Sequence, residues 1–328
     1  MGHWQSRRVL VTGAYGFLAS HLIEELLSRG AIVTGIVRDR PAESYLQLSG
    51  CENKIRVAAG DITDLEFCRR VINEQQIKDV FHLAAQAIVG LANRSPLSTL
   101  EANIRGTYML LEACRGLLAD RCPIESIVVA SSDKAYGDQE QLPYVETMPL
   151  MGQHPYDASK SCADIITRTF AVTYRLPAAV TRCANLYGPG DLNFSRILPD
   201  TFQALILGQR PIIRSDGTPL RDYLFVKNAV TGYLVLAETL SLGQCHGQAF
   251  NFGTGMPVTV IDLVKQIIKS THSKVTPKIL GEAQGEIKHQ YLDSTLAKKL
   301  WVGVHPHLLT KGYPIPIRGI RNICHSHA

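Results

Sequence analysis

The sequence RRVLVTGAYGFLASHLIEELLSRGAIVTGIVRD, residues 7–39, contains two short apolar runs separated by a glycine turn and a helical pattern. Residues 9–11 and 32–37 are apolar runs that predict strands, and apolar residues recur at helical spacing between residues 18 and 27. A strand, a helix and a second strand within about thirty residues form one βαβ unit. Such units build a parallel sheet through right-handed crossovers, so this stretch predicts a parallel α/β fold.

The same alternation continues to about residue 190. Further strands are expected within residues 54–64, 77–86, 124–137 and 177–190, with helical segments between them. After residue 190 the chain breaks into short pieces punctuated by proline and glycine, which is typical of a smaller mixed domain. We therefore predict a doubly wound parallel Rossmann sheet with a smaller mixed α/β substrate domain. The predicted boundaries are 1–188 plus about 224–252 for the Rossmann domain, 189–223 plus 253–300 for the substrate domain, and 301–328 for an atypical tail.

Composition and charge exclude several classes of protein. The chain has 328 residues, of which 45% are hydrophobic and 19% charged, and its net charge of +5 is spread along the sequence. This mild charge favours neither nucleic acid nor a membrane as a partner. The eight cysteines have no C-x-x-C or zinc spacing, which indicates reduced thiols and no metal site. No apolar run approaches the roughly 20 residues that span a bilayer, so we expect a soluble cytoplasmic protein, although Gly2 and Ser6 match the short myristoylation pattern.

The glycine turn predicts a dinucleotide site. Gly13, Gly16 and Ala19 form G-x-x-G-x-x-A directly after a strand and at the start of a helix. Glycine lets the backbone approach a pyrophosphate, and the helix N-terminus provides amide donors and positive potential. The alternative, a tight turn without a ligand, is weaker in this strand–turn–helix context.

Two later segments bear on which dinucleotide binds. An acid at the end of the second strand favours NAD, whereas an arginine can hold the extra phosphate of NADP. Arg38, Asp39 and Arg40 give a mixed signal there, so we expect NAD⁺, with NADP⁺ as the alternative because of Arg38. Asp61 and Ile62 follow the third strand, where they would meet the adenine, although Asp61 could equally cap the next helix.

A second motif provides a candidate catalytic pair. Tyr156 and Lys160 form Y-x-x-x-K, one turn apart on a helical face. A phenol has an unperturbed pKa of about 10, and a nearby ammonium together with the positive nicotinamide ring would stabilise its phenolate. Tyr156 could then take a hydroxyl proton while hydride passes to the cofactor. By itself the pair could also be an ordinary exposed helix pair.

With the glycine turn included, the chain resembles the extended short-chain dehydrogenase/reductase family, in its group of nucleotide-sugar epimerases and dehydratases. The resemblance covers residues 7 to about 300 and rests on motifs in family order: VTGAYGFLASHL, DITD, HLAAQ, NIRGT, SSDKAYG, YDASK, RCANLYGPGD and RDYLFV. It implies a tightly bound cofactor that is regenerated in each cycle and a nucleotide-diphosphate sugar as substrate.

The resemblance also implies the roles of individual residues. Those expected to bind the cofactor are Gly13, Tyr15, Gly16, Phe17, Leu18, Arg38, Asp61, Ile62, Leu83, Ala84, Ala85, Tyr156 and Lys160. Those expected to bind the substrate are Asn185, Asn193, Arg196 and Arg221. The expected catalytic residues are Ser132, Asp133, Lys134, Tyr156 and Lys160. Arg221 could instead form a salt bridge between domains, Asn103 is expected to order the floor of the site, and His82 to pack at a strand end.

The adjacent Asp133 and Lys134 select among the reactions of the family. In SSDKAYG an acid and a base follow the fifth strand, which is similar to the CDP-glucose 4,6-dehydratases. By that resemblance Tyr156 deprotonates the 4-hydroxyl, with Ser132 sharing the hydrogen bond, as hydride leaves C4. Asp133 then protonates the departing 6-hydroxyl, and Lys134 removes the C5 proton or acts as the electrostatic partner. The alternatives are a structural Asp–Lys pair, a 4-epimerase and a catalytically silent cofactor-binding scaffold.

Two expectations concern the helices and the end of the chain. The helices around residues 98–116 and 156–175 are those through which the family usually forms dimers, so the resemblance implies a homodimer. The ending from Lys298 lacks helical periodicity, whereas the family closes with a helix between a GW-x-P and a WY stretch. Codons for residues 301 onward can be chosen so that a shifted frame encodes that ending. We therefore hypothesise that residues 301–328 arise from a frameshift, which sequencing of the source DNA would settle.

Overall fold

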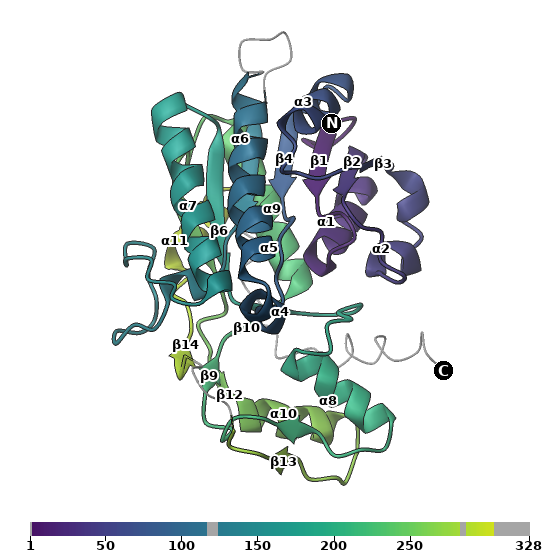
Figure 1. The fold of residues 1–328 in the computed structure, drawn as a ribbon, viewed down its shortest axis with the longest axis vertical. Coiled ribbons are helices and arrows are strands. Elements are labelled where there is room, and N and C mark those ends of the chain that lie inside the picture. The colour runs from purple at the N-terminus through teal and green to yellow at the C-terminus, as the bar shows by residue number, and fades with distance from the viewer. Residues whose placement is uncertain (1, 117–123, 283–286, 305–328) are drawn as a thin grey trace.

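The computed structural model describes residues 2–116, 124–282 and 287–304 (Figure 1). Its largest element is a seven-stranded sheet in the order β11–β6–β5–β4–β1–β2–β3, and every neighbouring pair in it is parallel. The strands are β1 (Arg8–Thr12), β2 (Ile32–Val37), β3 (Arg56–Ala59), β4 (Asp79–His82), β5 (Ser126–Ala130), β6 (Ala178–Cys183) and β11 (Ala249–Phe252). The sheet grows in both directions from β1, so the doubly wound Rossmann topology predicted from the sequence is confirmed.

Helices cover both faces of this sheet (Figure 1). On one face α6 (Gly106–Gly116) packs between α3 (Leu65–Glu74) and α7 (Pro155–Tyr174). On the other face α9 (Val226–Ser241) packs against α1 (Phe17–Ser28) and α11 (Thr295–Val304). The side chains of β1 alternate accordingly, because Val9 and Val11 join the core beside α1 and α9 whereas Leu10 joins the core beside α3 and α6. Burial on both faces explains why the strands are continuous apolar runs.

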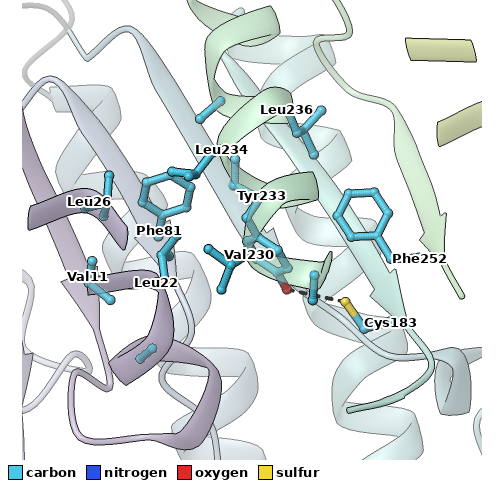
Figure 2. Close-up of a cluster of buried hydrophobic side chains, with 14 of the residues drawn as sticks. Val11, Leu22, Leu26, Phe81, Cys183, Val230, Tyr233, Leu234, Leu236 and Phe252 are labelled. Carbon is cyan, nitrogen blue, oxygen red and sulfur yellow. Dashed lines mark hydrogen bonds between the residues drawn. The ribbon is translucent and has the colours of Figure 1, made fainter. Parts of the chain in front are cut away.

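Tyr233 of α9 lies in the middle of the core between the sheet and helices α1 and α9 (Figure 2). Its ring centroid is 6.5 Å from that of Phe81 on β4 and 5.9 Å from that of Phe252 on β11. Its hydroxyl accepts a hydrogen bond from Thr181 at 2.5 Å and contacts the sulfur of Cys183 at 3.7 Å. One buried, hydrogen-bonded aromatic residue thus joins α9 to three strands of the sheet.

Two strands differ from the sequence prediction. The expected strand within residues 177–190 is divided, because β6 belongs to the main sheet whereas β7 (Asn185–Tyr187) pairs with β10 (Tyr223–Phe225). A continuous apolar run carries no information about such a change of partner. The seventh strand, β11, was not predicted; it has four residues, and one of them is the fully buried polar residue Asn251. Its amide is satisfied by the carbonyls of Tyr144 and Asp293, which are distant in the sequence.

A second group of elements lies beyond one end of the sheet (Figure 1). They include α8 (Ile197–Ile206), β8 (Ile212–Ile213), β9 (Leu220–Arg221), β12 (Val258–Thr259), α10 (Val260–Ser270), β13 (Lys278–Ile279) and β14 (His289–Gln290). Shorter helices are α2 (Tyr45–Leu48), η1 (Glu52–Lys54), α4 (Val89–Arg94), α5 (Pro96–Leu100), η2 (Glu101–Arg105) and η3 (Asp133–Tyr136). The domain boundaries given above remain a proposal.

The expectation of a non-helical ending from Lys298 is wrong for its first residues, because α11 continues to Val304. Residues 305–328 of the atypical tail lie outside the described residues, so the frameshift hypothesis stays a prediction. Among the helices that the structure describes, none combines the length and the apolar character needed to cross a bilayer.

Candidate active site

The glycine turn lies where the sheet changes direction, between the carboxyl ends of β1 and β4. Gly13 has φ +67°, and a Cβ atom on it would lie 2.8 Å from the Cα atom of Ala84, which follows β4. Gly16 is the N-cap of α1 and has no side-chain cap, so amides of the first turn remain directed outward. Only glycine permits this close approach of the turn to the neighbouring strand end, which is the role of the first glycine in a dinucleotide-binding turn. The predicted residues Gly13, Gly16 and Ala84 therefore fit a dinucleotide.

A buried hydrogen-bond network joins the same two strand ends. The hydroxyl of Thr12 lies 2.8 Å from Nδ1 of His82 and accepts hydrogen bonds from the backbone N–H groups of Leu83 and Ala84, at 3.1 and 3.0 Å. Nε2 of His82 lies 3.0 Å from the hydroxyl of Thr107 on α6. Burial lowers the pKa of His82 to about 3, so the ring is neutral. His82 is thus a packed strand-end residue, as expected from the sequence.

At the end of β2 a cavity of about 500 Å³ adjoins the glycine turn, and Tyr15, Arg38, Arg40 and Glu52 are among its lining residues. Arg38 forms an exposed ion pair with Asp39 at 2.6 Å. Arg40 pairs with Glu52 at 2.7 Å, and the hydroxyl of Tyr15 donates to the same carboxylate. Both arginines therefore have carboxylate partners at the position where an extra phosphate of NADP would lie.

Asp61 and Ile62 occupy the turn after β3. The carboxylate of Asp61 accepts hydrogen bonds from the backbone N–H and the hydroxyl of Thr63, both at 2.9 Å. The alternative that Asp61 caps the next helix is wrong, because Asp64 is the N-cap of α3. Ile62 is buried against Gly106, where a Cβ atom would come within 2.4 Å of the Ile62 side chain.

The predicted catalytic residues meet at the carboxyl end of β5. Tyr156 lies in the first turn of α7 and is hydrogen-bonded to Ser132, which follows β5. Lys160, one turn further along α7, is 5% exposed and donates a hydrogen bond from Nζ to the carbonyl of Ala130 at 2.8 Å. The Y-x-x-x-K pair is therefore not an exposed helix pair.

Burial dominates the electrostatics of this pair. It raises the pKa of Tyr156 to about 12, against the opposing hydrogen bond of Ser132 and the positive charge of Arg196. It also lowers the pKa of Lys160 to about 8. The positive charge of Arg196 lowers the pKa of Tyr156, but burial outweighs it, so the pKa moves opposite to the direction expected from the sequence.

Asp133 and Lys134 begin the short helix η3 directly after Ser132. The Ser132 hydroxyl accepts a hydrogen bond from the backbone N–H of Lys134 at 3.2 Å and lies 3.0 Å from Oδ1 of Asp133. Asp133 is 3% exposed, and its other oxygen, Oδ2, is buried without a hydrogen-bond partner among the described residues. Burial raises the pKa of Asp133 to about 6, against the opposing charge of Lys134. A buried carboxyl with one unused oxygen is available to a ligand.

Of the predicted substrate residues, Arg221 lies within electrostatic reach of Asp133. Arg221 on β9 donates from one nitrogen to the carbonyls of Leu220 and Lys288, at 2.9 and 3.1 Å, and its charge reaches Asp133. Asn185 on β7 donates to the carbonyl of Asp222 at 3.2 Å.

The other two substrate candidates lie before α8. Oδ1 of Asn193 accepts hydrogen bonds from the backbone N–H and the hydroxyl of Ser195, at 3.1 and 2.6 Å, so this side chain stabilises its own turn. Arg196 pairs with the buried Asp191 at 3.2 Å, and its charge is also felt by Tyr156. Of the two, Arg196 is therefore the one that faces the catalytic residues.

Asn103 connects the segment after β4 to the first turn of α7. It lies in the π-helical turn η2, and its amide exchanges hydrogen bonds with the backbone of Gln86, at 2.7 and 3.1 Å. Its nitrogen also donates to the hydroxyl of Ser159 at 2.8 Å, and Ser159 donates to the carbonyl of Tyr156 at 2.7 Å. A π-helical turn of this kind is frequent at functional sites.

Sequence reasoning missed Asp157, a buried carboxyl next to Tyr156 in the sequence. A signal for it was present, because polar residues recur along α7 at the spacing of one helical face, and all four are buried: Asp157, Lys160, Ser161 and Asp164. A polar stripe that faces inward indicates a site or a buried network rather than a solvated surface. No group of His, Cys, Asp or Glu within the described ranges is arranged to hold a metal ion.

Comparison with known proteins connects this geometry to established activities. The model of the NAD dependent epimerase/dehydratase family matches residues 9–253. A CDP-glucose 4,6-dehydratase of Salmonella typhimurium is 34% identical over 262 residues, which are 76% of this chain and 72% of that protein. A UDP-glucose 4-epimerase of Mycolicibacterium smegmatis is 31% identical over 324 residues, covering 96% and 99% of the two chains. The crystal structure of a Thermotoga maritima UDP-glucose 4-epimerase with UDP-glucose is similar with a TM-score of 0.80 at 27% identity, covering 89% and 91%.

Proposed function

The chain belongs to the NAD dependent epimerase/dehydratase family, and from that premise we propose that it is a nucleotide-sugar 4,6-dehydratase that acts on CDP-glucose. One observation carries the proposal. A buried acid with an unused oxygen, Asp133, lies next to Lys134 at the same strand end as Tyr156. Epimerisation at C4 removes no proton from C5 and no water from C6, so it has no use for a second acid–base pair. Dehydration needs such a pair.

The first half of the reaction is the oxidation of the sugar at C4. NAD⁺ held at the glycine turn would accept hydride from C4 and return it to C6. Tyr156 accepts the proton of the 4-hydroxyl, and Ser132 shares a hydrogen bond with both the phenol and the sugar. Because burial raises the pKa of Tyr156, its deprotonation depends on positive charge nearby, which Arg196 supplies.

The second half is the loss of water across C5 and C6. A ketone at C4 acidifies the C5 proton, which a base removes while an acid protonates the 6-hydroxyl. The family resemblance assigns Asp133 as the acid, with Lys134 as the base or as its electrostatic partner. The raised pKa of Asp133, about 6, is suited to proton transfer near neutral pH.

The remaining contacts concern the nucleotide and the cofactor. Arg221 and Asn185 would hold the diphosphate, and a guanidinium suits phosphate geometry. The choice of CDP-glucose is supported by the Salmonella relative, which is named for that substrate. The choice of NAD⁺ over NADP⁺ is supported by the carboxylates of Asp39 and Glu52, which pair with Arg38 and Arg40 and would repel a 2′-phosphate.

Product analysis tests the proposal. The protein is incubated separately with CDP-glucose, UDP-glucose, dTDP-glucose and GDP-mannose, and the mass of each product is measured by mass spectrometry. We expect loss of one water from CDP-glucose without net formation of NADH. Tyr156→Phe should abolish this loss, whereas Tyr144→Phe, which removes a buried hydroxyl bonded to the carbonyl of Gly137, should retain it if the protein folds. Loss of water from another nucleotide sugar alone would refute the choice of base, and no loss from any would refute the dehydratase.

A second candidate is a 4-epimerase, which the Mycolicibacterium relative favours because it matches almost the whole chain. The same incubations separate the two functions. An epimerase leaves the substrate mass unchanged and inverts the 4-hydroxyl, which proton NMR of the released sugar detects. This outcome would leave Asp133 and Lys134 as a structural pair.

We also propose a homodimer through α5, α6 and α7. Four large apolar side chains on these helices are exposed: Leu97 by 71%, Ile165 by 53%, Val172 by 74% and Tyr174 by 46%. Three of the four lie on α7 and Leu97 lies on α5, and exposed apolar side chains favour association. Light scattering of the wild type and of Val172→Glu tests this, because the substitution should produce a monomer, while Leu242→Glu, at a site that is 70% exposed elsewhere, should not.

A further inference from the structure

Asp222 is a fully buried carboxylate that takes no part in the proposed reaction, and it lies between β9 and β10, directly after Arg221. Its two side-chain oxygens accept hydrogen bonds from the backbone N–H of Thr254, at 3.0 and 3.1 Å, and one of them also accepts from the N–H of Gly255 at 3.1 Å. The hydroxyl of Thr254 donates to the same carboxylate. Because a buried charge is costly unless hydrogen bonds satisfy it, these donors fix the Asp222 side chain to the loop after β11.

The loop after β11 packs tightly against this carboxylate. Gly253 directly follows β11, and a Cβ atom on it would clash with Oδ2 of Asp222 and lie 3.1 Å from the Cβ atom of Leu292. The backbone N–H of Gly253 donates to the hydroxyl of Ser294 at 2.8 Å, which holds the loop on its other side. The position of Asp222 is therefore set by the carboxyl end of the main sheet, the edge at which the glycine turn also lies.

The main chain of Asp222 is bonded to Asn185, one of the residues expected to bind the substrate. The Asp222 carbonyl accepts hydrogen bonds from the backbone N–H of Asn185 at 3.1 Å and from Nδ2 of the same residue at 3.2 Å. Tyr223, the next residue along the chain, pairs with Asn185 in the register of β10 and β7. Asp222 thus lies between the two residues expected to hold the diphosphate, bonded to Asn185 and adjacent in the chain to Arg221.

We propose that Asp222 is a positioning residue for the diphosphate of the substrate, because it fixes the segments that carry Asn185 and Arg221 relative to the carboxyl end of the main sheet. This role rests on the proposed function, in which these two residues hold the diphosphate. The sign of the effect separates positioning from charge. A carboxylate repels a diphosphate, so loss of the Asp222 charge by itself would strengthen binding, whereas loss of the positioning weakens it.

Asp222 also has a simpler interpretation. A buried carboxylate bonded to successive backbone amides can stabilise one loop of the fold without affecting any ligand. Its replacement would then lower stability and leave the affinity for a nucleotide unchanged. Asp79 provides the comparison, because it is also fully buried and is bonded to Arg7 at 2.6 Å and to Ser126 at 2.7 Å. It begins β4, at the opposite end of the sheet from the glycine turn.

Ligand binding to the protein in the presence of NAD⁺ tests the proposal. The dissociation constant of CDP is measured by calorimetry, and that of cytidine, which lacks the phosphates, by NMR titration. In Asp222→Asn the amide nitrogen cannot accept from the N–H of Gly255, so the clamp opens. We expect CDP binding to weaken at least about tenfold and cytidine binding to change less than about twofold. Asp79→Asn should lower stability in urea and leave both dissociation constants unchanged.

Gly253→Ala is the second variant, and it retains the charge of Asp222. Its added Cβ atom displaces Oδ2, so it should also weaken CDP binding and spare cytidine. Unchanged or tighter CDP binding in both variants would overturn the proposal, as would an equal loss for CDP and cytidine. A wild type that binds UDP, dTDP or GDP instead is compared with that diphosphate and its nucleoside, and binding of none refutes the proposal. If the wild type binds CDP but removes no water from CDP-glucose, the dehydratase function fails, whereas the binding comparison still decides the role of Asp222.

Discussion

Replacing Arg182 by methionine should destabilise the fold more than a change at any exposed arginine, because this guanidinium is fully buried. Two of its nitrogens donate to the two carboxylate oxygens of Asp164 on α7, at 2.8 and 3.0 Å. A nitrogen also donates to the hydroxyl of Tyr136 at 2.7 Å and to the carbonyl of Glu146 at 3.1 Å. Burial acts to lower the pKa of Arg182, and Asp164 more than offsets it, so the net pKa is raised. The pair is charged in the folded protein.

The magnitude follows from what Arg182→Met leaves behind. Breaking a buried ion pair by removing one partner costs about 3–5 kcal/mol, because the other charge is left uncompensated. The carbonyl of Glu146 and the hydroxyl of Tyr136 each lose a donor, which adds about 1–3 kcal/mol. Arg168, whose guanidinium is 4.0 Å from Asp164, compensates part of the remaining charge. We therefore expect a loss of about 4–6 kcal/mol in the free energy of unfolding, a large share of the roughly 5–15 kcal/mol of an ordinary domain.

Urea unfolding followed by circular dichroism measures this loss, with the fluorescence of the buried Trp4 as a second probe. Arg168→Met is the matched control, since this exposed arginine also lies near Asp164, and it should cost less than about 1 kcal/mol. The double variant Asp164→Leu with Arg182→Met removes both charges and should be more stable than Arg182→Met alone by about 3 kcal/mol.

Two results would refute this reasoning. A loss below about 1 kcal/mol for Arg182→Met would mean that the buried pair is not a significant contribution. A double variant no more stable than the single one would mean that the loss comes from packing rather than from the uncompensated charge of Asp164. Because Tyr136 ends the helix that carries Asp133, the single variant should also lower turnover at temperatures where it remains folded.

Three other perturbations have outcomes that the structure sets. Because burial lowers the pKa of His82 to about 3 from its ordinary 6.5, only the unfolded chain takes up this proton near pH 5, so wild-type stability falls by about 2 kcal/mol from pH 7 to pH 5 on its account. In urea unfolding at the same two pH values, the free energy of unfolding of His82→Gln should fall less than that of the wild type, by this amount. Gly13→Ala should weaken NAD⁺ binding at least about tenfold in calorimetry, because the added Cβ atom would lie 2.8 Å from the Cα atom of Ala84. Gly50→Ala is the control: Gly50 has a similar φ of +68°, but no atom lies within 4 Å of its added Cβ, so the change should cost only about 1–2 kcal/mol of stability. Lys160→Met should abolish turnover yet raise the free energy of unfolding at pH 7 by about 2 kcal/mol. Burial lowers the pKa of Lys160 to about 8, so the wild type gains stability as the pH rises from about 8 to about 10.4. Unfolding at about pH 7 and about pH 9 checks this, and an equal or lower stability of the variant at the lower pH would contradict it.

Much of the site could be predicted because its residues follow strand ends or lie one helical turn apart. Gly13 and Gly16 come directly after β1, and Tyr156 and Lys160 are four residues apart on α7. In a parallel sheet the carboxyl ends of the strands meet at one edge, so residues after separate strands converge without any knowledge of their contacts. Asp133 was found in this way, as the residue that begins η3 after β5.

The βαβ order, the glycine turn and the residue types at the strand ends could be predicted because they depend on short periodicities and on turns of a few residues. Tertiary packing, in contrast, determines that β7 leaves the main sheet, that β11 joins it through the buried Asn251, and that Asp157 is buried next to Tyr156. It also decided the direction of the Tyr156 pKa, which burial raises although a lysine lies one turn away. The physical reason is the same in each case: burial and charge act between groups that are close in space, and distance along the chain does not report that closeness.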